Sequence, residues 1–159
     1  MIVYLDSSAV AKRYVEERGS DLLDRIYSRA EAGELQIAFS IWNLGEVLGV
    51  LDRYRTRNII SEAELRVSYQ NLILESVKMI KLGSLIIQPI TSAILVESWV
   101  IVLDHHIYQA DALQITNAKT LGSDLLLTAD NKMLEVARSS ELVAFDVESE
   151  ANDVNEALA

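Results

Sequence analysis

Residues 2–6 of the chain, Ile2-Val3-Tyr4-Leu5-Asp6, form a short apolar run that ends in an acid and leads into a helical pattern. Similar apolar runs of four to six residues recur along the chain, and such runs are typical of strands buried in a parallel sheet. The predicted strands are Ile2–Leu5, Leu35–Phe39, Leu85–Ile90, Leu125–Ala129 and Leu142–Phe145.

Longer segments with helical spacing separate these runs. We expect helices at Ala9–Glu17, Asp21–Ala32, Trp42–Arg57, Glu62–Leu82, Ser92–Leu103, Gln109–Leu121 and Lys132–Arg138. Strands that alternate with helices indicate an α/β fold with a mostly parallel sheet and helices on both faces. No strand separates the third and fourth helices, so we expect them to form a helical hairpin beside the sheet.

Composition limits the classes of protein that the chain can belong to. Its 159 residues suffice for one domain, and the absence of cysteine excludes disulfide frameworks, cysteine-based metal sites and thiol catalysis. The net charge of −10 is unlike that of a non-specific nucleic-acid binder. Five acids and no base lie in residues 146–159. We therefore predict a domain over residues 1–146 and an acidic, flexible tail over residues 147–159.

We expect neither a signal peptide nor a segment that crosses a bilayer as one span. The run before Asp6 is too short and lacks a basic start, and the richest apolar stretch is interrupted by Gln88, Pro89 and Glu97. We expect a soluble, cytoplasmic protein.

Two acids directly follow predicted strands. Asp6 ends the first run and Asp130 follows Leu125–Ala129, which places both at the carboxyl edge of the sheet, where α/β proteins bind ligands. Each could instead be a simple helix N-cap. Asp124 precedes its strand, so we expect it on the opposite edge, roughly 17 Å away.

Two further acids lie on helices that the strands lead into. Asp111 shares a helix face with Ile107 and Ile115, where an unpaired carboxylate is costly, and Glu46 lies early in the helix after Leu35–Phe39. Four carboxylates at one edge repel each other unless cations neutralise them. An all-oxygen set suits Mg²⁺ or Mn²⁺, which can support phosphodiester hydrolysis.

Four segments in order resemble the motifs of PIN-domain ribonucleases, specifically the VapC-type toxins of toxin–antitoxin pairs. They are Val3-Tyr4-Leu5-Asp6-Ser7-Ser8-Ala9, Ser40-Ile41-Trp42-Asn43-Leu44-Gly45-Glu46-Val47, Ala110-Asp111-Ala112-Leu113-Gln114-Ile115-Thr116-Asn117-Ala118 and Leu127-Thr128-Ala129-Asp130-Asn131-Lys132-Met133-Leu134. The resemblance covers about residues 1–146.

The resemblance implies a three-layer α/β/α sandwich around a five-stranded parallel sheet and a metal-dependent endoribonuclease. It implies that Asp6, Glu46, Asp111 and Asp130 are the catalytic, metal-binding quartet. Ser8 would orient Asp6, and Thr128 would have a supporting role near Asp130. Relatives commonly form dimers, and the toxins are inhibited by an antitoxin protein that enters the acidic groove.

Several basic residues are candidates for RNA contact. Arg53, Arg55 and Arg57 lie together near a helix end, where cations also favour the helix dipole, and Lys12 and Arg13 follow Asp6 by one to two turns. They are the candidate contacts to the phosphates of the RNA.

The sequence lacks residues that two other classes of protein require. A haloacid-dehalogenase phosphatase needs a second aspartate where Ser8 stands, and residues 6–13 lack the glycines of a nucleotide-binding loop. The alternative that stays open is a catalytically inactive PIN-like binding or regulatory module.

The predicted hairpin is more apolar than one sheet face requires. Tyr69, Leu72, Ile73 and Ile80 recur at helical spacing, which predicts either packing within the domain or a partner surface. We expect a homodimer or higher oligomer, or an antitoxin complex, that uses this region.

Overall fold

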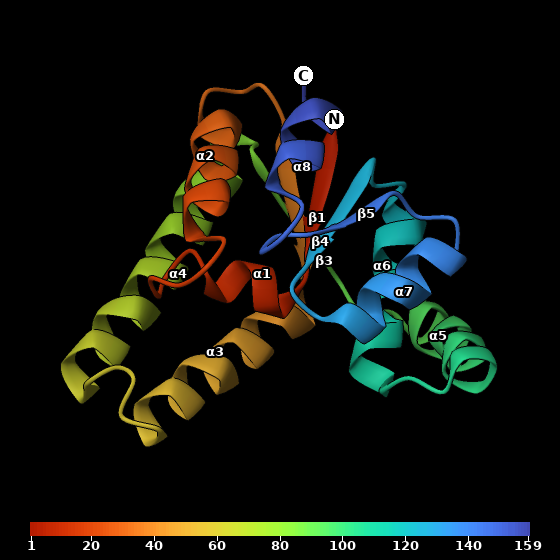
Figure 1. Cartoon of the computed structure of the whole chain (residues 1–159), viewed down its shortest axis with the longest axis horizontal. Coiled ribbons are helices and arrows are strands. Elements are labelled where there is room, and N and C mark those ends of the chain that lie inside the picture. Colours follow the sequence, from red (N-terminus) through yellow and green to blue (C-terminus); the bar gives the residue numbers. More distant parts are fainter.

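The computed structural model describes all 159 residues and contains one parallel sheet of five strands in the order β3-β2-β1-β4-β5 (Figure 1). The strands are β1 (Ile2–Leu5), β2 (Gln36–Ser40), β3 (Leu85–Gln88), β4 (Leu125–Thr128) and β5 (Ala144–Asp146). Every neighbouring pair is parallel. The predicted α/β class and strand locations are therefore confirmed.

Eight helices connect and cover the strands. They are α1 (Ser7–Ala11), α2 (Ser20–Glu31), α3 (Ile41–Thr56), α4 (Glu62–Leu82), α5 (Ser92–His105), α6 (Gln109–Leu121), α7 (Asn131–Ser139) and α8 (Ala151–Ala157). None is long and apolar enough to cross a membrane.

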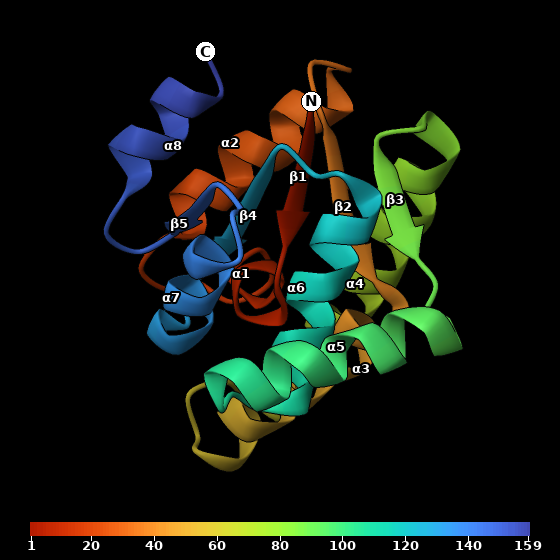
Figure 2. The same cartoon turned by 90° about the vertical axis from the view of Figure 1, so that its right-hand side faces the viewer.

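Alternate residues of each strand supply two separate cores. Val3 and Leu5 of β1 belong to a cluster of 24 buried residues that also draws on α1, α2, α3, α4 and α8. Tyr4, between them, belongs to a cluster of 12 on the other face, with residues of α6 and α7. This period of two follows from the strand pleat and gives the predicted three-layer sandwich. Figure 2 shows α5 outside α6, away from the sheet.

Helices α3 and α4 follow one another without a strand, as predicted, and they diverge from their connection as an open V (Figure 1). Asn58, in the turn between the two helices, adopts the left-handed conformation at φ 56°. Ser61 begins α4 with a capping box to Glu64, and Gly83 ends it in the left-handed conformation at φ 73°. The predicted bounds of α4 are confirmed for these local reasons.

Helix α1 is shorter than the predicted Ala9–Glu17 because the chain turns after Ala11. Lys12, only 3% exposed, forms ion pairs with Glu17 at 3.3 Å and Glu148 at 2.5 Å. A buried, paired lysine holds residues 12–17 in a loop against the C-terminal part of the chain.

The C-terminal residues differ from the predicted flexible tail. Residues 151–157 form α8, and Val147, Val154 and Leu158 are 1%, 0% and 5% exposed within the larger core cluster. Val154 and Leu158 are four residues apart and therefore lie on the same helix face. Apolar burial along that face outweighs the acidic composition, because the two acids within the helix, Asp153 and Glu156, are exposed.

Candidate acidic active site

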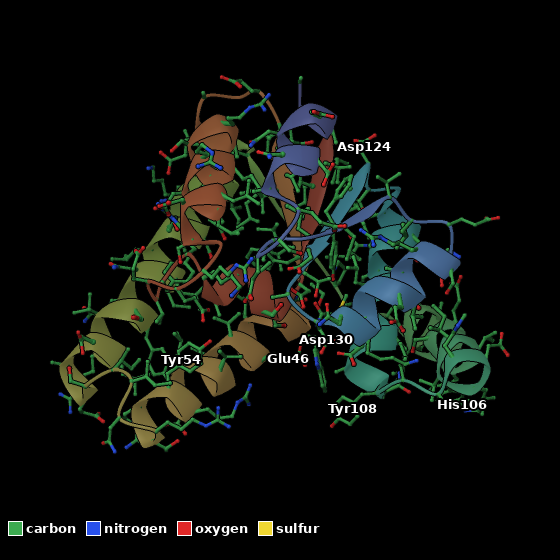
Figure 3. The ribbon with its side chains drawn as sticks, viewed as in Figure 1. Glu46, Tyr54, His106, Tyr108, Asp124 and Asp130 are labelled. Atoms are coloured by element: carbon green, nitrogen blue, oxygen red, sulfur yellow. The ribbon has the colours of Figure 1, made fainter.

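The carboxyl ends of the strands bring the predicted acids toward one edge of the sheet. Asp6 directly follows β1, Asp130 follows β4 by two residues, and Glu46 lies in α3, which begins where β2 ends. Figure 3 shows Glu46 and Asp130 at this edge and Asp124 at the other end of the molecule. Asp124 instead accepts a 2.6 Å hydrogen bond from the Ile2 backbone N–H.

Asp6 is the most deeply buried acid of the site, at 4% exposure. Its Oδ1 accepts from the Ala9 backbone N–H at 2.8 Å, Ser8 Oγ lies 2.8 and 2.9 Å from its two oxygens, and Thr128 Oγ1 donates to Oδ2 at 2.8 Å. Burial nevertheless raises the pKa of Asp6 to about 6, because these hydrogen bonds only partly offset the loss of water.

Thr128 and Ser8 connect Asp6 to the loop that carries Asp130. The Asp130 backbone N–H donates to Thr128 Oγ1 at 2.9 Å, and the Ala129 N–H donates to Ser8 Oγ at 2.8 Å. The Asp130 Oδ1 accepts from the Met133 N–H and so caps α7. The acid therefore has the N-cap role that the sequence allowed, in addition to its place at the edge.

Glu46 is held by residues that the sequence analysis did not single out. Ser7 Oγ donates to Glu46 Oε2 at 2.5 Å, and Gln114 Nε2 donates to the same oxygen at 2.8 Å. Asn43 Nδ2 in turn donates to Gln114 Oε1 at 2.6 Å and to the Leu5 carbonyl at 3.1 Å. Asn43 and Gln114 are 0% and 2% exposed, so a buried amide network supports the glutamate.

Asp111 lies in the first turn of α6 and is partly buried. The apolar face with Ile107 and Ile115 is buried, and so are Ala110 and Leu113, because α6 lies between the sheet and α5. Burial raises the pKa of Asp111 to about 6, and the negative charges of the other three acids, Asp130, Glu46 and Asp6, add to the rise. Asp111 is therefore close enough to each of the other three acids to be repelled by it.

The predicted basic contacts divide into two groups. Lys12 is buried in its ion pairs, Arg13 pairs with Asp24 and Glu75, and Arg55 pairs with Asp52 at 2.8 Å and Glu62 at 3.7 Å. Arg53 and Arg57 form no ion pair and line a hollow of about 300 Å³ beside Ser8 and Ala129. Only this second pair is free to meet an external anion next to the acids.

The chemistry of the acidic edge suits a hard divalent cation. The four acids supply only oxygen donors, and no cationic side chain is hydrogen-bonded to them. In this structure no group of three or more histidine, cysteine, aspartate or glutamate side chains is arranged so that it could hold a metal ion. Ser7 and Gln114 occupy Oε2 of Glu46, and no donor is hydrogen-bonded to its Oε1.

A sequence comparison identifies the family of this chain. The family model described as the PIN domain matches residues 3–139, which include all four acids. No curated protein matches the sequence.

Solved structures with the same fold share little sequence with the chain. PAE2754 from Pyrobaculum aerophilum has a TM-score of 0.64 at 16% identity, over 98% of this chain and 90% of its own. Mycobacterium tuberculosis VapC20, described as a sarcin–ricin loop cleaving toxin, has a TM-score of 0.61 at 14% identity, over 89% and 96%. FitAcB from Neisseria gonorrhoeae has a TM-score of 0.62 at 15% identity, over 92% and 98%.

Proposed function

Because this chain belongs to the PIN-domain family, we propose that it is a divalent-metal-dependent endoribonuclease that hydrolyses RNA phosphodiester bonds. The observation that supports this most is the convergence of four carboxylates from β1, α3, α6 and the β4–α7 connection. Burial raises the pKa of Asp111, and the negative charges of Asp130, Glu46 and Asp6 add to the rise, so a bound cation would relieve this repulsion.

We assign Asp6, Glu46, Asp111 and Asp130 as the residues that would hold Mg²⁺ or Mn²⁺. A divalent cation in such a site lowers the pKa of a water and offsets charge that develops on the phosphate. Ser8 and Thr128 orient Asp6 through their hydroxyls, and Gln114 positions Glu46. The side chains thus supply negative charge on a rigid support at the edge of the sheet.

Metal binding can be tested without measuring cleavage. Binding to a folded-state acid cluster stabilises the fold by mass action, so millimolar Mg²⁺ or Mn²⁺ is expected to raise the melting temperature. The variant Glu46→Gln should weaken this rise. An unchanged melting temperature of the original protein at millimolar metal would count against the quartet as a cation site.

Activity is tested with Asp6→Asn. This variant keeps the size of the side chain and should abolish metal-dependent cleavage of RNA while the protein stays folded. Cleavage that persists in purified Asp6→Asn would show that the activity does not use this edge. A protein of the original sequence that binds RNA without cleaving it would instead favour the inactive binding or regulatory module.

We further propose that the protein is the toxin of a toxin–antitoxin pair, acting in the cytoplasm. VapC20, which is described as a toxin that cleaves the sarcin–ricin loop, shares the fold and supports this class of function. FitAB, another neighbour, has been solved with a DNA fragment. The toxin assignment predicts that expression of the protein arrests growth and that expression of Asp6→Asn does not. The product of an adjoining gene should relieve the arrest.

A further inference from the structure

One face of α3 connects the acidic edge to a pair of unpaired cations. Val50, Arg53 and Arg57 follow Glu46 by 4, 7 and 11 residues, which places all four near one face of a helix with 3.6 residues per turn. Arg53 is therefore roughly 10 Å further along the helix axis than Glu46. Figure 3 shows α3 running from Glu46 toward Tyr54 without a break.

The arginines line a hollow that shares a wall with the acidic site. The hollow measures about 300 Å³ and lies between α1, α3 and the connections after β4 and β5. Ser8 and Ala129 are part of its lining, Ser8 Oγ contacts both oxygens of Asp6, and Ala129 directly precedes Asp130. A strand bound at the acids would therefore have this hollow beside it.

Most charges in the hollow are neutralised within the chain. Lys12 pairs with Glu148 and Glu17, and the Tyr54 hydroxyl donates to Glu17 at 3.0 Å. Arg55, between the two arginines in sequence, pairs with Asp52 on a different side of α3. Lys12 offsets only one of its two glutamates, so Arg53 and Arg57, which form no ion pair, leave the hollow with a net charge of +1.

Arg53 is directed back toward the acidic site. One of its Nη atoms lies 3.7 Å from where a Cβ on Gly49 would be, so its side chain runs along α3 toward Glu46. Gly49 leaves space for this path. The positive group is thus closer to the acids than the position of its Cα indicates.

We propose that this hollow is a phosphate subsite, in which Arg53 and Arg57 bind a backbone phosphate that flanks the scissile bond of a single RNA strand. The inference rests on the proposed ribonuclease function and adds the path of the substrate along α3. Phosphate contacts position a strand without reading its sequence, and guanidinium groups bind phosphates through two parallel hydrogen bonds. In a chain of net charge −10, a local cationic pair offsets the repulsion between RNA and the acids.

The first experiment compares Arg53→Gln, Arg57→Gln and the double variant with Arg25→Gln, which removes the same charge from an exposed, unpaired position on α2. Each hollow variant should raise the KM for a single-stranded oligoribonucleotide about fivefold with kcat nearly unchanged, and Arg53→Lys should recover part of the loss. The salt dependence of kcat/KM should decrease by a slope of about 1 for each arginine removed. Arg25→Gln should match the unmodified protein.

The second experiment locates the bound phosphate. Single neutral methylphosphonate linkages are placed one at a time around the cleaved bond, and one flanking position should reduce cleavage by the unmodified protein. The Arg53→Gln, Arg57→Gln double variant should be insensitive at that position. If the double variant loses as much cleavage as the unmodified protein when that linkage is neutral, the proposed subsite is wrong. It is also wrong if the hollow variants have the same KM as Arg25→Gln.

RNA binding in chelator separates this proposal from the proposed activity. Fluorescence anisotropy of a labelled strand should show weaker binding for the hollow variants than for Arg25→Gln. If the protein binds RNA through these arginines but never cleaves it, the subsite stands and the ribonuclease proposal fails. If it cleaves RNA but Arg53 and Arg57 affect neither KM nor binding, the activity stands and the subsite fails.

Discussion

Asp111 shows how burial and repulsion act on one residue. Its pKa is raised to about 6 by burial and by the charges of Asp130, Glu46 and Asp6. The folded state therefore binds this proton more tightly than the unfolded chain, whose aspartates titrate near 4. By linkage, the stabilisation from protonation is fully present below about pH 4 and is lost as the pH rises through about 6.

We therefore expect the metal-free protein to become more stable as the pH falls from 7 to 5, measured as melting temperature in chelator. Asp111→Asn should raise the melting temperature at pH 7 on the order of 3 °C, the shift that about 1 kcal/mol gives in a domain of this size. It should also reduce the pH dependence, of which Asp6, whose pKa burial raises to about 6, contributes the rest. Glu135→Gln removes a charge from the exposed side of α7 and serves as the control. A lower melting temperature for Asp111→Asn than for the control would contradict this account.

The residues of the site differ in how well the sequence predicts them. Asp6 and Asp130 can be predicted because an acid that follows a buried strand of a parallel sheet must lie at the carboxyl edge of that sheet. Gln114 and Asn43 were missed, since an amide within a helix gives no signal unless its partner is known. The spacing of Asn43 from Ser40 and of Gln114 from Asp111, three residues each, was the available hint.

At the scale of strands and helices, the location of an acid relative to its strand decides at which edge of the sheet the acid lies. Asp124 precedes β4 and bonds the Ile2 N–H, whereas Asp130 follows β4. Asp124→Asn keeps an acceptor for that bond, so we expect cleavage rates within about twofold of the original, a difference of about 0.4 kcal/mol in the barrier. Asp130→Asn keeps the N-cap of α7 but should lose activity. Equal losses in both variants would contradict the assignment of the acidic edge.

Local signals and distant contacts explain which elements could be predicted. Helices α4 and α6 match their predicted bounds, because caps and glycines beside them act locally. The early end of α1 depends on the pairing of Lys12 with Glu148, and α8 depends on burial of Val154 and Leu158 in the core and on the bond from Arg29 of α2 to the Leu158 carbonyl. These partners are more than 100 positions apart in sequence. The composition of residues 147–159 shows that the segment is acidic, but it does not show that Val154 and Leu158 are buried in the core.

Helix α8 gives a direct test of this point. Val154 is 0% exposed, so Val154→Ala should lower the free energy of unfolding by about 1–2 kcal/mol through lost burial. Asn155→Ala changes the neighbouring exposed position and should have little effect. Chemical denaturation measures both. Equal stabilities of the two variants would mean that the C-terminal helix does not contribute to the core.

At the scale of the whole molecule, the apolar residues of α4 serve two different surfaces. Leu72 is 0% exposed and belongs to the core, as does the nearby Leu65 at 5%, so part of the stripe expected to meet a partner packs within the domain. Ile73, Val77 and Ile80 remain 50%, 44% and 47% exposed. Helix α5 exposes a further apolar face that the sequence analysis did not identify, formed by Leu95, Val96, Trp99, Val100 and Leu103. Exposed apolar residues concentrated on a helix face favour association.

We therefore expect a homodimer or higher oligomer, or a complex with an antitoxin, that uses the exposed face of α4. Static light scattering at micromolar concentration should give a mass above 17.7 kDa, and the Ile73→Gln, Ile80→Gln double variant should return it to the monomer mass. The matched control is Trp99→Gln, Leu103→Gln on α5, which should keep the larger mass. Dissociation by the α5 pair alone would place the interface on α5 instead. Burial of either face in a partner would raise the measured mass. If the protein stays monomeric at all concentrations, and also when an antitoxin candidate is co-expressed, neither face mediates association.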